Sequence, residues 1–300
     1  WVSLGHSNGG VAPDAVAEDA AHILADSERV IQRWHDPQPG SMQQVALAPC
    51  SPYSVSAAMM RETAALARRH GVRLHTHLAE SREEVAFCRS RHGHSPVLHA
   101  EALDWLGEDV WFAHLIHPGS SDLPRLAASG CGVAHCPCSN MRLGNGIAPI
   151  GDYLKHGIAV GLGFDGGASN DAADLLAESR QAMLLQRVNA GADAMTAHQA
   201  LALATVGGAQ VLGRDDIGRL EVGMAADIAG FRLDALELSG AAVHDPVGAL
   251  VFCPPPRADL VVINGRPTIR GGEVLGSDLG ALAAAHNQAA TALVARAGLG

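Results

Sequence analysis

Between residue 44 and about residue 190, short apolar runs alternate with longer stretches that have the periodicity of amphipathic helices. Each run is four to seven residues long and almost continuously apolar or β-branched, which is typical of parallel strands buried on both faces. Strand–helix alternation over this length predicts either a (β/α) barrel or a doubly wound sheet. The runs are Val45–Ala48, Val72–Leu78, Val110–Ala113, Gly132–His135 and Ala159–Phe164.

The residues at the ends of four of these runs favour the barrel. In (β/α) barrels the chemistry collects at the carboxyl ends of the strands, which converge on one mouth. We therefore predict an α/β fold of the (β/α)8 TIM-barrel type. The strand ends that carry ligand-type side chains are His75-Thr76-His77, Ala113-His114, Ala134-His135-Cys136 and Phe164-Asp165.

Helix start and stop signals punctuate the stretches between the runs. Ser81 and Thr196 are each followed three residues later by Glu or Gln, which is the pattern of a capping box. Glycine after a periodic stretch indicates a helix end. The helices so predicted run from Pro13-Asp14 to Trp34, from Ser81 to Gly93, from Ser95-Pro96 to Gly107 and from Thr196 through Ala204.

The pattern changes after about residue 213. Short β-type runs joined by glycine turns replace the strand–helix alternation, and Asn264-Gly265 is a hairpin signal. We predict a barrel over 1–213, a β-sandwich portion over 214–276 and a C-terminal helix over 277–300. The expected strands are 217–223, 226–231 and 260–266, and the expected helix is Leu279 to Ala297.

Composition excludes several classes of function. The formal net charge is −10, so no basic stripe is expected for nucleic acid or an anionic membrane. The sequence contains no apolar run of 18 residues, the length that a spanning helix needs. Six cysteines in 300 residues indicate reduced thiols rather than a disulfide scaffold. We expect a cytoplasmic protein, and a homo-oligomer is left open.

Four strand-end residues form the candidate site: His77, Glu80, His114 and Asp165. Imidazole and carboxylate groups suit one divalent metal, Zn²⁺ first and Fe²⁺ as the alternative. Glu80, one turn beyond the strand, is placed to shuttle protons without binding the metal. His75 is expected to face away from His77 and to pack structurally.

Other histidines receive no functional role. The segment His135-Cys136-Pro137-Cys138 resembles half of a structural zinc site, but no second Cys/His pair follows at zinc-site spacing. The remaining histidines are expected to be ordinary: His117, His198 and the His92/His94 pair.

The motifs resemble those of the amidohydrolase superfamily, and more narrowly its cytosine/guanine deaminase and triazine hydrolase branch. His75 to Glu80 is similar to the fifth-strand motif, Ala113-His114 to the sixth-strand histidine, and Gly161 to Gly166 to the eighth-strand aspartate motif. Gly218 to Asp227 resembles the C-terminal β-sandwich segment of that branch.

The resemblance implies a role for each candidate residue. His77 and Asp165 would ligate the metal, and Asp165 would also take a proton from the bound water. Glu80 would protonate the ring nitrogen beside the carbon under attack. His114 would polarise the site or help to deprotonate the nucleophile. Water would then replace the amine, which leaves as ammonia.

One departure from the family concerns its first strand, which ends in a His-x-His pair of metal ligands. The sequence has no such pair, and His6-Ser7-Asn8 is no substitute for it. Trp1 is expected to lie near the third barrel strand, so that strands 1 and 2 are missing. We therefore expect the chain to be an N-terminally truncated fragment that carries half of the metal ligands and is inactive as it stands.

Within the branch, three segments resemble those of 8-oxoguanine deaminases. The predicted substrate is therefore a small heterocycle, 8-oxoguanine, converted to uric acid and ammonia. Guanine deaminases have arginine where Cys50 aligns, which argues against guanine. The residues expected to contact substrate are Cys50, Ser139, Asn140 and Arg142.

Two kinds of alternative stay open. One is a hydrolase of another ring: isoxanthopterin, guanine, cytosine, an adenosine-like nucleoside, or an amino- or chlorotriazine. The other is a non-catalytic scaffold that keeps the fold without the reaction. A substrate panel separates the members of the first group. The upstream coding sequence bears on the second, because a His-x-His pair after an apolar strand there would support the enzyme and its absence would support a degenerate copy.

Overall fold

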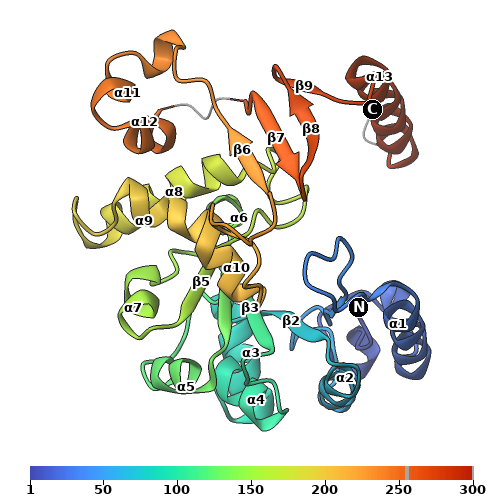
Figure 1. Cartoon of the computed structure of the whole chain (residues 1–300). Helices are drawn as coiled ribbons and strands as arrows, with labels where there is room; N and C mark the ends of the chain where they lie inside the picture. Colours follow the sequence, from blue (N-terminus) through green and yellow to red (C-terminus); the bar gives the residue numbers. More distant parts are fainter. Residues whose placement is uncertain (254–256, 299–300) are drawn as a thin grey trace.

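The computed structural model describes residues 1–253 and 257–298. The described residues contain a five-stranded parallel sheet whose strand order follows the chain (Figure 1). A doubly wound sheet would reverse its order at a switch point, whereas consecutive parallel strands are the arrangement of a (β/α) barrel. The predicted fold class is thus confirmed. The strands are β1 Ala46–Leu47, β2 Arg73–Leu78, β3 Val110–His114, β4 Gly132–His135 and β5 Ala159–Leu162.

Helices connect these strands and cover the sheet from outside. Side-chain caps begin four of them, because Ser56, Ser81, Ser95 and Asp174 each accept a hydrogen bond from a backbone N–H in the first turn. Gly71, Gly93 and Gly130 end three of them in the left-handed conformation. The helices are α2 Ala57–His70, α3 Arg82–His92, α4 Pro96–Ala102, α5 Asp122–Ser129, α6 Pro137–Arg142, α7 Ile150–Lys155 and α8 Leu175–Ala190.

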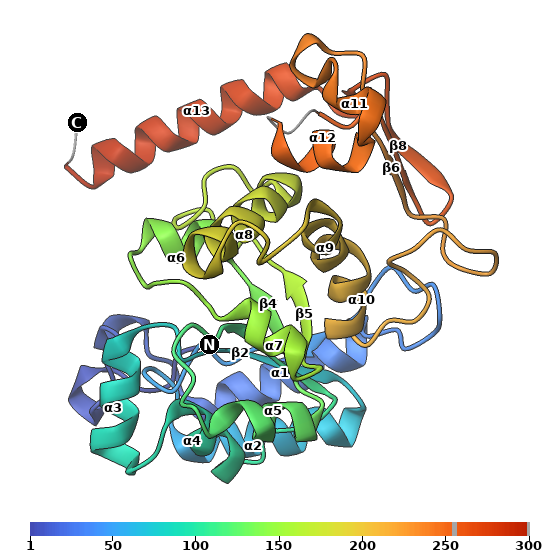
Figure 2. The same cartoon turned by 90° about the vertical axis from the view of Figure 1, so that its left-hand side faces the viewer.

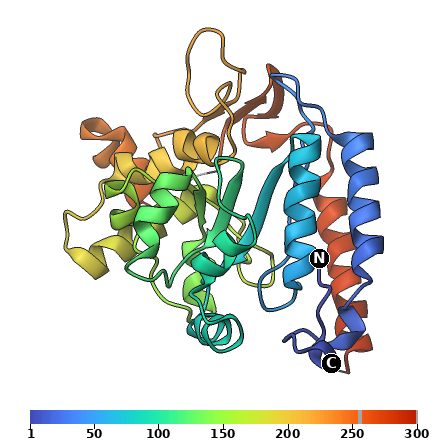
Figure 3. The ribbon, with the colours of Figure 1, turned by 90° about the horizontal axis from the view of Figure 1, so that it is seen from below.

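Two predicted helix boundaries are wrong. The first helix, α1 Ala20–Trp34, begins after Asp19, whose side chain caps it, and Asp14–Val16 forms a separate 3-10 turn. Figure 3 shows α1 alongside α2. Helix α4 ends at Ala102 rather than near Gly107. The chain turns there because Trp105 is drawn into the core, where its indole N–H donates to the Met60 carbonyl.

The capping boxes form only in part. Thr196 and Gln199 make both bonds at the start of α9 Ala197–Ala202, as predicted. The Ser81 side chain caps α3, but the Glu84 carboxylate accepts from the N–H groups of Ala79 and Glu80 instead of from Ser81. The glutamate therefore holds the loop between β2 and α3.

The core lies between the sheet and the outer helices. Leu74, Phe112 and Val133 are each 0% exposed. In β2 fully buried side chains alternate with partly buried ones, so the opposite face of the sheet is more open than the prediction of strands buried on both faces implied. Burial of this apolar surface supplies most of the driving force for folding.

The edge strand β5 is covered by the segment after α9. A π-helical turn at Leu203–Gly207 and the short α10 Gly208–Val211 pack against β5. Glycine is required here, since a Cβ on Gly161 would lie 2.8 Å from the Gly208 Cα atom, and one on Gly207 would lie 2.2 Å from the Val160 carbonyl oxygen. Covering an edge in this way protects it from pairing with other chains.

The C-terminal part forms an antiparallel sheet. Among the described residues it has four strands, in the order β6-β7-β8-β9, and they make one sheet rather than a two-sheet sandwich. The predicted hairpin is confirmed, with Asn264 and Gly265 both at positive φ between β7 and β8. The predicted strand 217–223 is wrong, because that segment is an irregular loop. The strands are β6 Ile228–Gly230, β7 Leu260–Ile263, β8 Arg266–Arg270 and β9 Glu273–Val274.

Helices flank this sheet in the sequence. The predicted terminal helix is confirmed as α13 Leu279–Arg296, which has no buried residue and projects from the rest of the chain (Figure 2). The short α11 Ala241–His244 and α12 Pro246–Phe252 were not predicted, and α12 packs against α8 and α9. Among the residues described, no helix is long and apolar enough to cross a membrane.

The N-terminal segment does not form the third barrel strand that we expected near Trp1. Its backbone bonds instead to the loop after β1: the Trp1 carbonyl accepts from the Cys50 N–H, and the Ser3 and Leu4 N–H groups both donate to the Ser54 carbonyl. The predicted boundary at residue 213, between the barrel and the C-terminal β region, stays a prediction.

Candidate metal centre and active site

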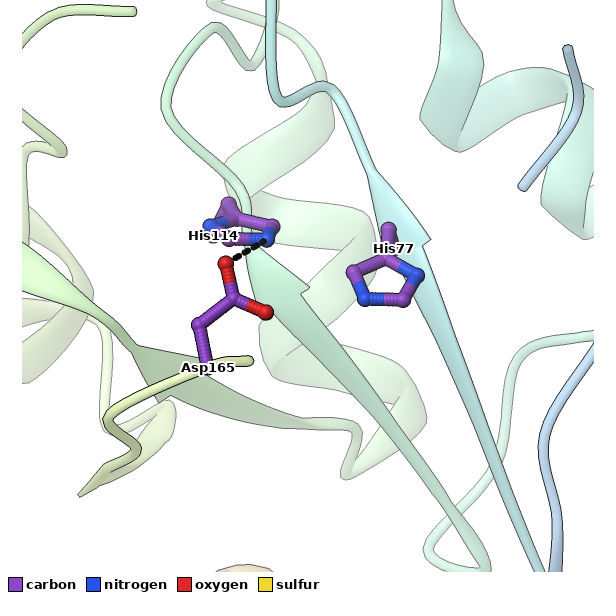
Figure 4. A group of neighbouring side chains, drawn as sticks. All are labelled: His77, His114 and Asp165. Carbon is purple, nitrogen blue, oxygen red and sulfur yellow. Dashed lines mark ion pairs between the residues drawn. The ribbon is translucent and has the colours of Figure 1, made fainter. Parts of the chain in front are cut away.

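Three side chains meet at the carboxyl ends of the parallel strands (Figure 4). His77 lies on β2, His114 ends β3, and Asp165 follows β5. One ligand atom from each lies within 4.8 Å of the others. The strand register explains the meeting, because Leu78 pairs with His114 and His77 with Ala113. Three of the four predicted site residues are therefore brought together by neighbouring strand ends.

The backbone is strained where two of these side chains leave their strands. His114 and Leu115 have φ of 66° and 44°, and Asp165 has φ of 65°. Non-glycine residues at such φ each cost about 1–3 kcal/mol and persist only where the surroundings hold them. The buried Tyr153 hydroxyl donates to the Leu115 carbonyl. This bond fixes the bend that aims His114 into the site.

Hydrogen bonds assign the tautomers of both histidines. The Nδ1–H of His77 donates to the Cys50 carbonyl over 2.6 Å. The Nδ1–H of His114 donates to the Asn140 Oδ1 over 2.9 Å. Because each Nδ1 carries its proton toward an acceptor, Nε2 is the nitrogen that can offer a lone pair to a metal once it carries no proton. Such partners are those that orient metal-bound histidines in proteins.

Hydrogen bonds also shift the pKa values of His77 and Asp165. Hydrogen bonding to Cys50 raises the pKa of His77 to about 9, against the effect of burial. Burial raises the pKa of Asp165, but hydrogen bonds from Ser139, Ser169 and the Gly166 N–H outweigh it and hold that pKa below the usual range. A metal would therefore meet an ionised carboxylate and displace a proton from His77.

Glu80 lies next to the cluster of His77, His114 and Asp165 but is not one of its three candidate metal ligands. Its Oε1 lies 3.8 Å from the His114 Nε2, and Asp165 Oδ2 lies 3.9 Å from the same nitrogen. The Asn145 side-chain N–H donates to Glu80 Oε1 over 2.9 Å. The Glu84 carboxylate accepts a hydrogen bond from the backbone N–H of Glu80 over 2.8 Å. Burial raises the pKa of Glu84 to about 7 despite its two backbone donors.

The four residues predicted to contact substrate occupy different settings, and their contact with substrate stays a prediction. Ser139 and Asn140 are both 0% exposed in the structure. Their side chains hydrogen-bond to residues of the site. The Ser139 hydroxyl donates to Asp165 Oδ2 over 2.6 Å, and the Asn140 Oδ1 accepts from the His114 Nδ1–H. Arg142 is exposed and pairs with Asp171 over 2.5 Å, away from the cluster. Cys50 is near the site, with its carbonyl bonded to His77.

The orientation predicted for His75 is wrong. Residues two apart in a strand face the same side, and His75 and His77 line one cavity of about 270 Å³ on the inner face of the sheet, together with Asp165. The structural role predicted for His75 agrees with its contacts. It stacks on Trp111 at 4.9 Å between ring centroids, and burial lowers its pKa to about 4.

The other histidines occupy varied settings. His135 is fully buried, and among the described residues neither of its ring nitrogens has a hydrogen-bond partner. His92 stacks on His99 at 3.8 Å. His117 is closer to the site than we expected, because its Nε2–H donates to the Asn145 carbonyl over 2.7 Å.

Three supporting residues escaped the sequence analysis: Glu84, Asn145 and Ser169. Ser169, four residues after Asp165, donates to its Oδ2 over 2.9 Å, and this short spacing was a usable signal. Glu84 was recognised only as a helix cap. Asn145 is 65 residues from Glu80 along the chain, and no local pattern connects the two.

The fold and the cluster of strand-end ligands define a class of protein. The profile of the amidohydrolase family matches residues 3–274, and the chain belongs to this family. Among curated proteins, it is 48% identical to the 8-oxoguanine deaminase of Pseudomonas aeruginosa, an alignment that covers 98% of this chain and 65% of that protein. It is 43% identical to an isoxanthopterin deaminase from an unknown prokaryotic organism, covering 74% of this chain and 49% of the relative.

A solved structure of a related enzyme has the same fold. The atrazine chlorohydrolase of Arthrobacter aurescens TC1, crystallised with zinc, superimposes with a TM-score of 0.91 at 35% identity. The superposition covers 96% of this chain and 64% of that one. The chain thus spans just under two thirds of the length of the 8-oxoguanine deaminase and the chlorohydrolase, and about half that of the isoxanthopterin deaminase.

Proposed function

We propose that this chain forms the metal-binding and catalytic part of a hydrolase that deaminates a purine-like ring. The observation that carries the proposal is the convergence of His77, His114 and Asp165, with the Glu80 carboxylate 3.8 Å from the His114 Nε2. Two kinds of group are needed for hydrolytic deamination, ligands for a metal and a carboxylate that moves protons. Both are present at one end of the sheet. Family membership and the deaminases among the relatives support the assignment.

The donor set fits a divalent metal. His77 and Asp165 would hold the ion, since imidazole Nε2 and carboxylate oxygen are ligands of Zn²⁺ and Fe²⁺ alike. His114 would lie beside it. Zinc is the first choice, supported by the zinc in the crystals of the chlorohydrolase.

The chain's own residues divide the proton transfers between them. A bound metal supplies Lewis acidity that makes a water molecule a better nucleophile at neutral pH. Asp165 accepts a proton from the attacking water, and Glu80 delivers one to the ring nitrogen beside the carbon under attack. The His114 Nε2 faces both carboxylates, and its lone pair accepts a hydrogen bond from the attacking water, which helps to deprotonate that water. The water oxygen bonds to the amine-bearing carbon. Asp165 then passes its proton to the amine, the hydroxyl proton returns to Glu80 as the C=O bond forms, and the C–N bond breaks so that ammonia leaves.

The substrate we propose is 8-oxoguanine, which water converts to uric acid and ammonia. The 48% identity to an 8-oxoguanine deaminase across nearly the whole chain favours it. Isoxanthopterin is the first alternative, because a deaminase of that compound is 43% identical. Guanine, cytosine and triazines follow.

The test is uric acid formation, followed by its ultraviolet absorbance, with the zinc-loaded protein at the length that its gene encodes. Rapid conversion of 8-oxoguanine, faster than that of isoxanthopterin, guanine, cytosine or atrazine at equal concentration, would establish the proposal. Faster turnover of another ring would keep the deaminase or hydrolase and change its substrate. Zinc uptake without turnover of any of them would contradict the catalytic assignment, and absence of zinc uptake would favour a scaffold.

A further inference from the structure

We propose that Asn145 is a positioning residue that orients the Glu80 carboxylate for proton transfer, an inference that rests on the proposed function. Its side-chain N–H donates to Glu80 Oε1 over 2.9 Å. The same oxygen lies 3.8 Å from the His114 Nε2. In the parts of the chain that the structure describes, no hydrogen bond to Glu80 Oε2 is formed, so this oxygen is available to carry the proton.

Asn145 is itself held firmly by its main chain. Its N–H donates to the Asn140 carbonyl over 2.9 Å, and its carbonyl accepts from the His117 Nε2–H over 2.7 Å. The glycines on either side, Gly144 and Gly146, have φ of 70° and 122°, which only glycine adopts freely. A Cβ on Gly146 would lie 3.4 Å from the His117 ring. The side chain is therefore presented from a fixed backbone.

The segment 139–145 acts on three different groups of the site. Ser139 bonds to Asp165, Asn140 bonds to His114, and Asn145 bonds to Glu80. Ser139 and Asn140 are fully buried behind their partners, whereas Asn145 reaches its partner from the rim. One segment following β4 thus sets the geometry of groups that come from β2, β3 and β5.

The isosteric substitution Asn145→Asp separates this role from a purely structural one. It leaves both main-chain hydrogen bonds and the size of the side chain unchanged, and Asp and Asn behave alike in turns. It replaces the N–H donor with a carboxylate oxygen that repels Glu80. If Asn145 only shaped the loop, Asp would serve nearly as well as Asn.

The experiment compares the zinc-loaded wild-type protein with Asn145→Asp, Asn145→Ala and the control Asn189→Ala, an exposed position on α8. We expect kcat to fall about 10- to 100-fold in both Asn145 variants, with Asp no better than Ala. KM should stay within about twofold and zinc content should be unchanged, because Asn145 does not contact His77, His114 or Asp165. The control should match the wild type.

A crystal structure of Asn145→Asp supplies a readout that does not depend on turnover. We expect the Glu80 carboxylate to leave its place beside His114 while the 139–145 backbone stays as it is. If the wild type deaminates nothing, the proposed function fails, and the position of Glu80 still decides this inference. Glu80 unmoved in the variant, or Asn145→Asp with wild-type kcat, would overturn it.

Discussion

The His114 ring donates from Nδ1 to the Asn140 Oδ1 over 2.9 Å, and both side chains are buried, at 1% and 0% exposure. This single bond decides which nitrogen of His114 faces Glu80 and Asp165. Asn140 therefore acts on the site through His114.

Replacing Asn140 tests that role. Asn140→Leu removes the acceptor, and we expect kcat to fall about 10- to 100-fold because His114 can then rotate or change tautomer. Asn140→Asp is the matched control, since it keeps an acceptor, and the Asn140 Nδ2 that it loses has no partner in the described parts of the chain. Steady-state kinetics at pH 7 check both. Equal activity of Asn140→Leu and the wild type would contradict the role.

Glu80→Gln should abolish most of the turnover and leave the metal in place. The amide cannot accept and release the proton, and general acid–base groups contribute about 10²- to 10⁴-fold to the rate. The control is Glu83→Gln, an exposed glutamate in the first turn of α3. Measuring kcat and zinc content together makes the check, and unchanged turnover would remove Glu80 from the mechanism.

Zinc should stabilise the protein through His77. A ligand that binds only the folded state adds about 2.7 kcal/mol at 100 times its Kd, so thermal unfolding should occur at a higher temperature with zinc than with a chelator. His77→Ala should lose this difference, whereas His198→Ala, which changes an exposed histidine, should keep it. A zinc-dependent Tm that survives in His77→Ala would place the metal elsewhere.

The pH dependence of stability should become shallower in His99→Phe. Burial lowers the pKa of His99 to about 4, below its unfolded value near 6.5. Between these values the unfolded chain binds the proton and the folded one does not, so stability is lost as the pH falls from about 6.5 toward 4. The phenylalanine ring preserves the packing against His92 and cannot be protonated.

Urea unfolding at pH 7.5 and pH 5.0 measures this effect. The free energy of unfolding of the wild type should fall more between the two pH values than that of His99→Phe. The difference is bounded by about 1.4 kcal/mol per pH unit and is smaller where solvent screens the ring. Equal losses in the two proteins would show that His99 is not the group responsible.

Local sequence determined the framework of this protein. Apolar runs with buried-strand composition located all five strands of the parallel sheet, because a run of that length can be buried only in the middle of a layered fold. The same runs located His77, His114 and Asp165, since parallel strands end at one edge. Alternation in β2 also places His75 beside His77, so that error was avoidable from the sequence.

Tertiary structure decided which neighbours support the site. Ser139 and Asn140 looked equally suited to contact a substrate, and only the packing of α6 under the strand ends shows that they face Asp165 and His114. The pairing of Asn145 with Glu80 joins residues 65 positions apart. Hydrogen bonds of this kind depend on distances across the fold, and the periodicity of a sequence reports only the face on which a residue lies.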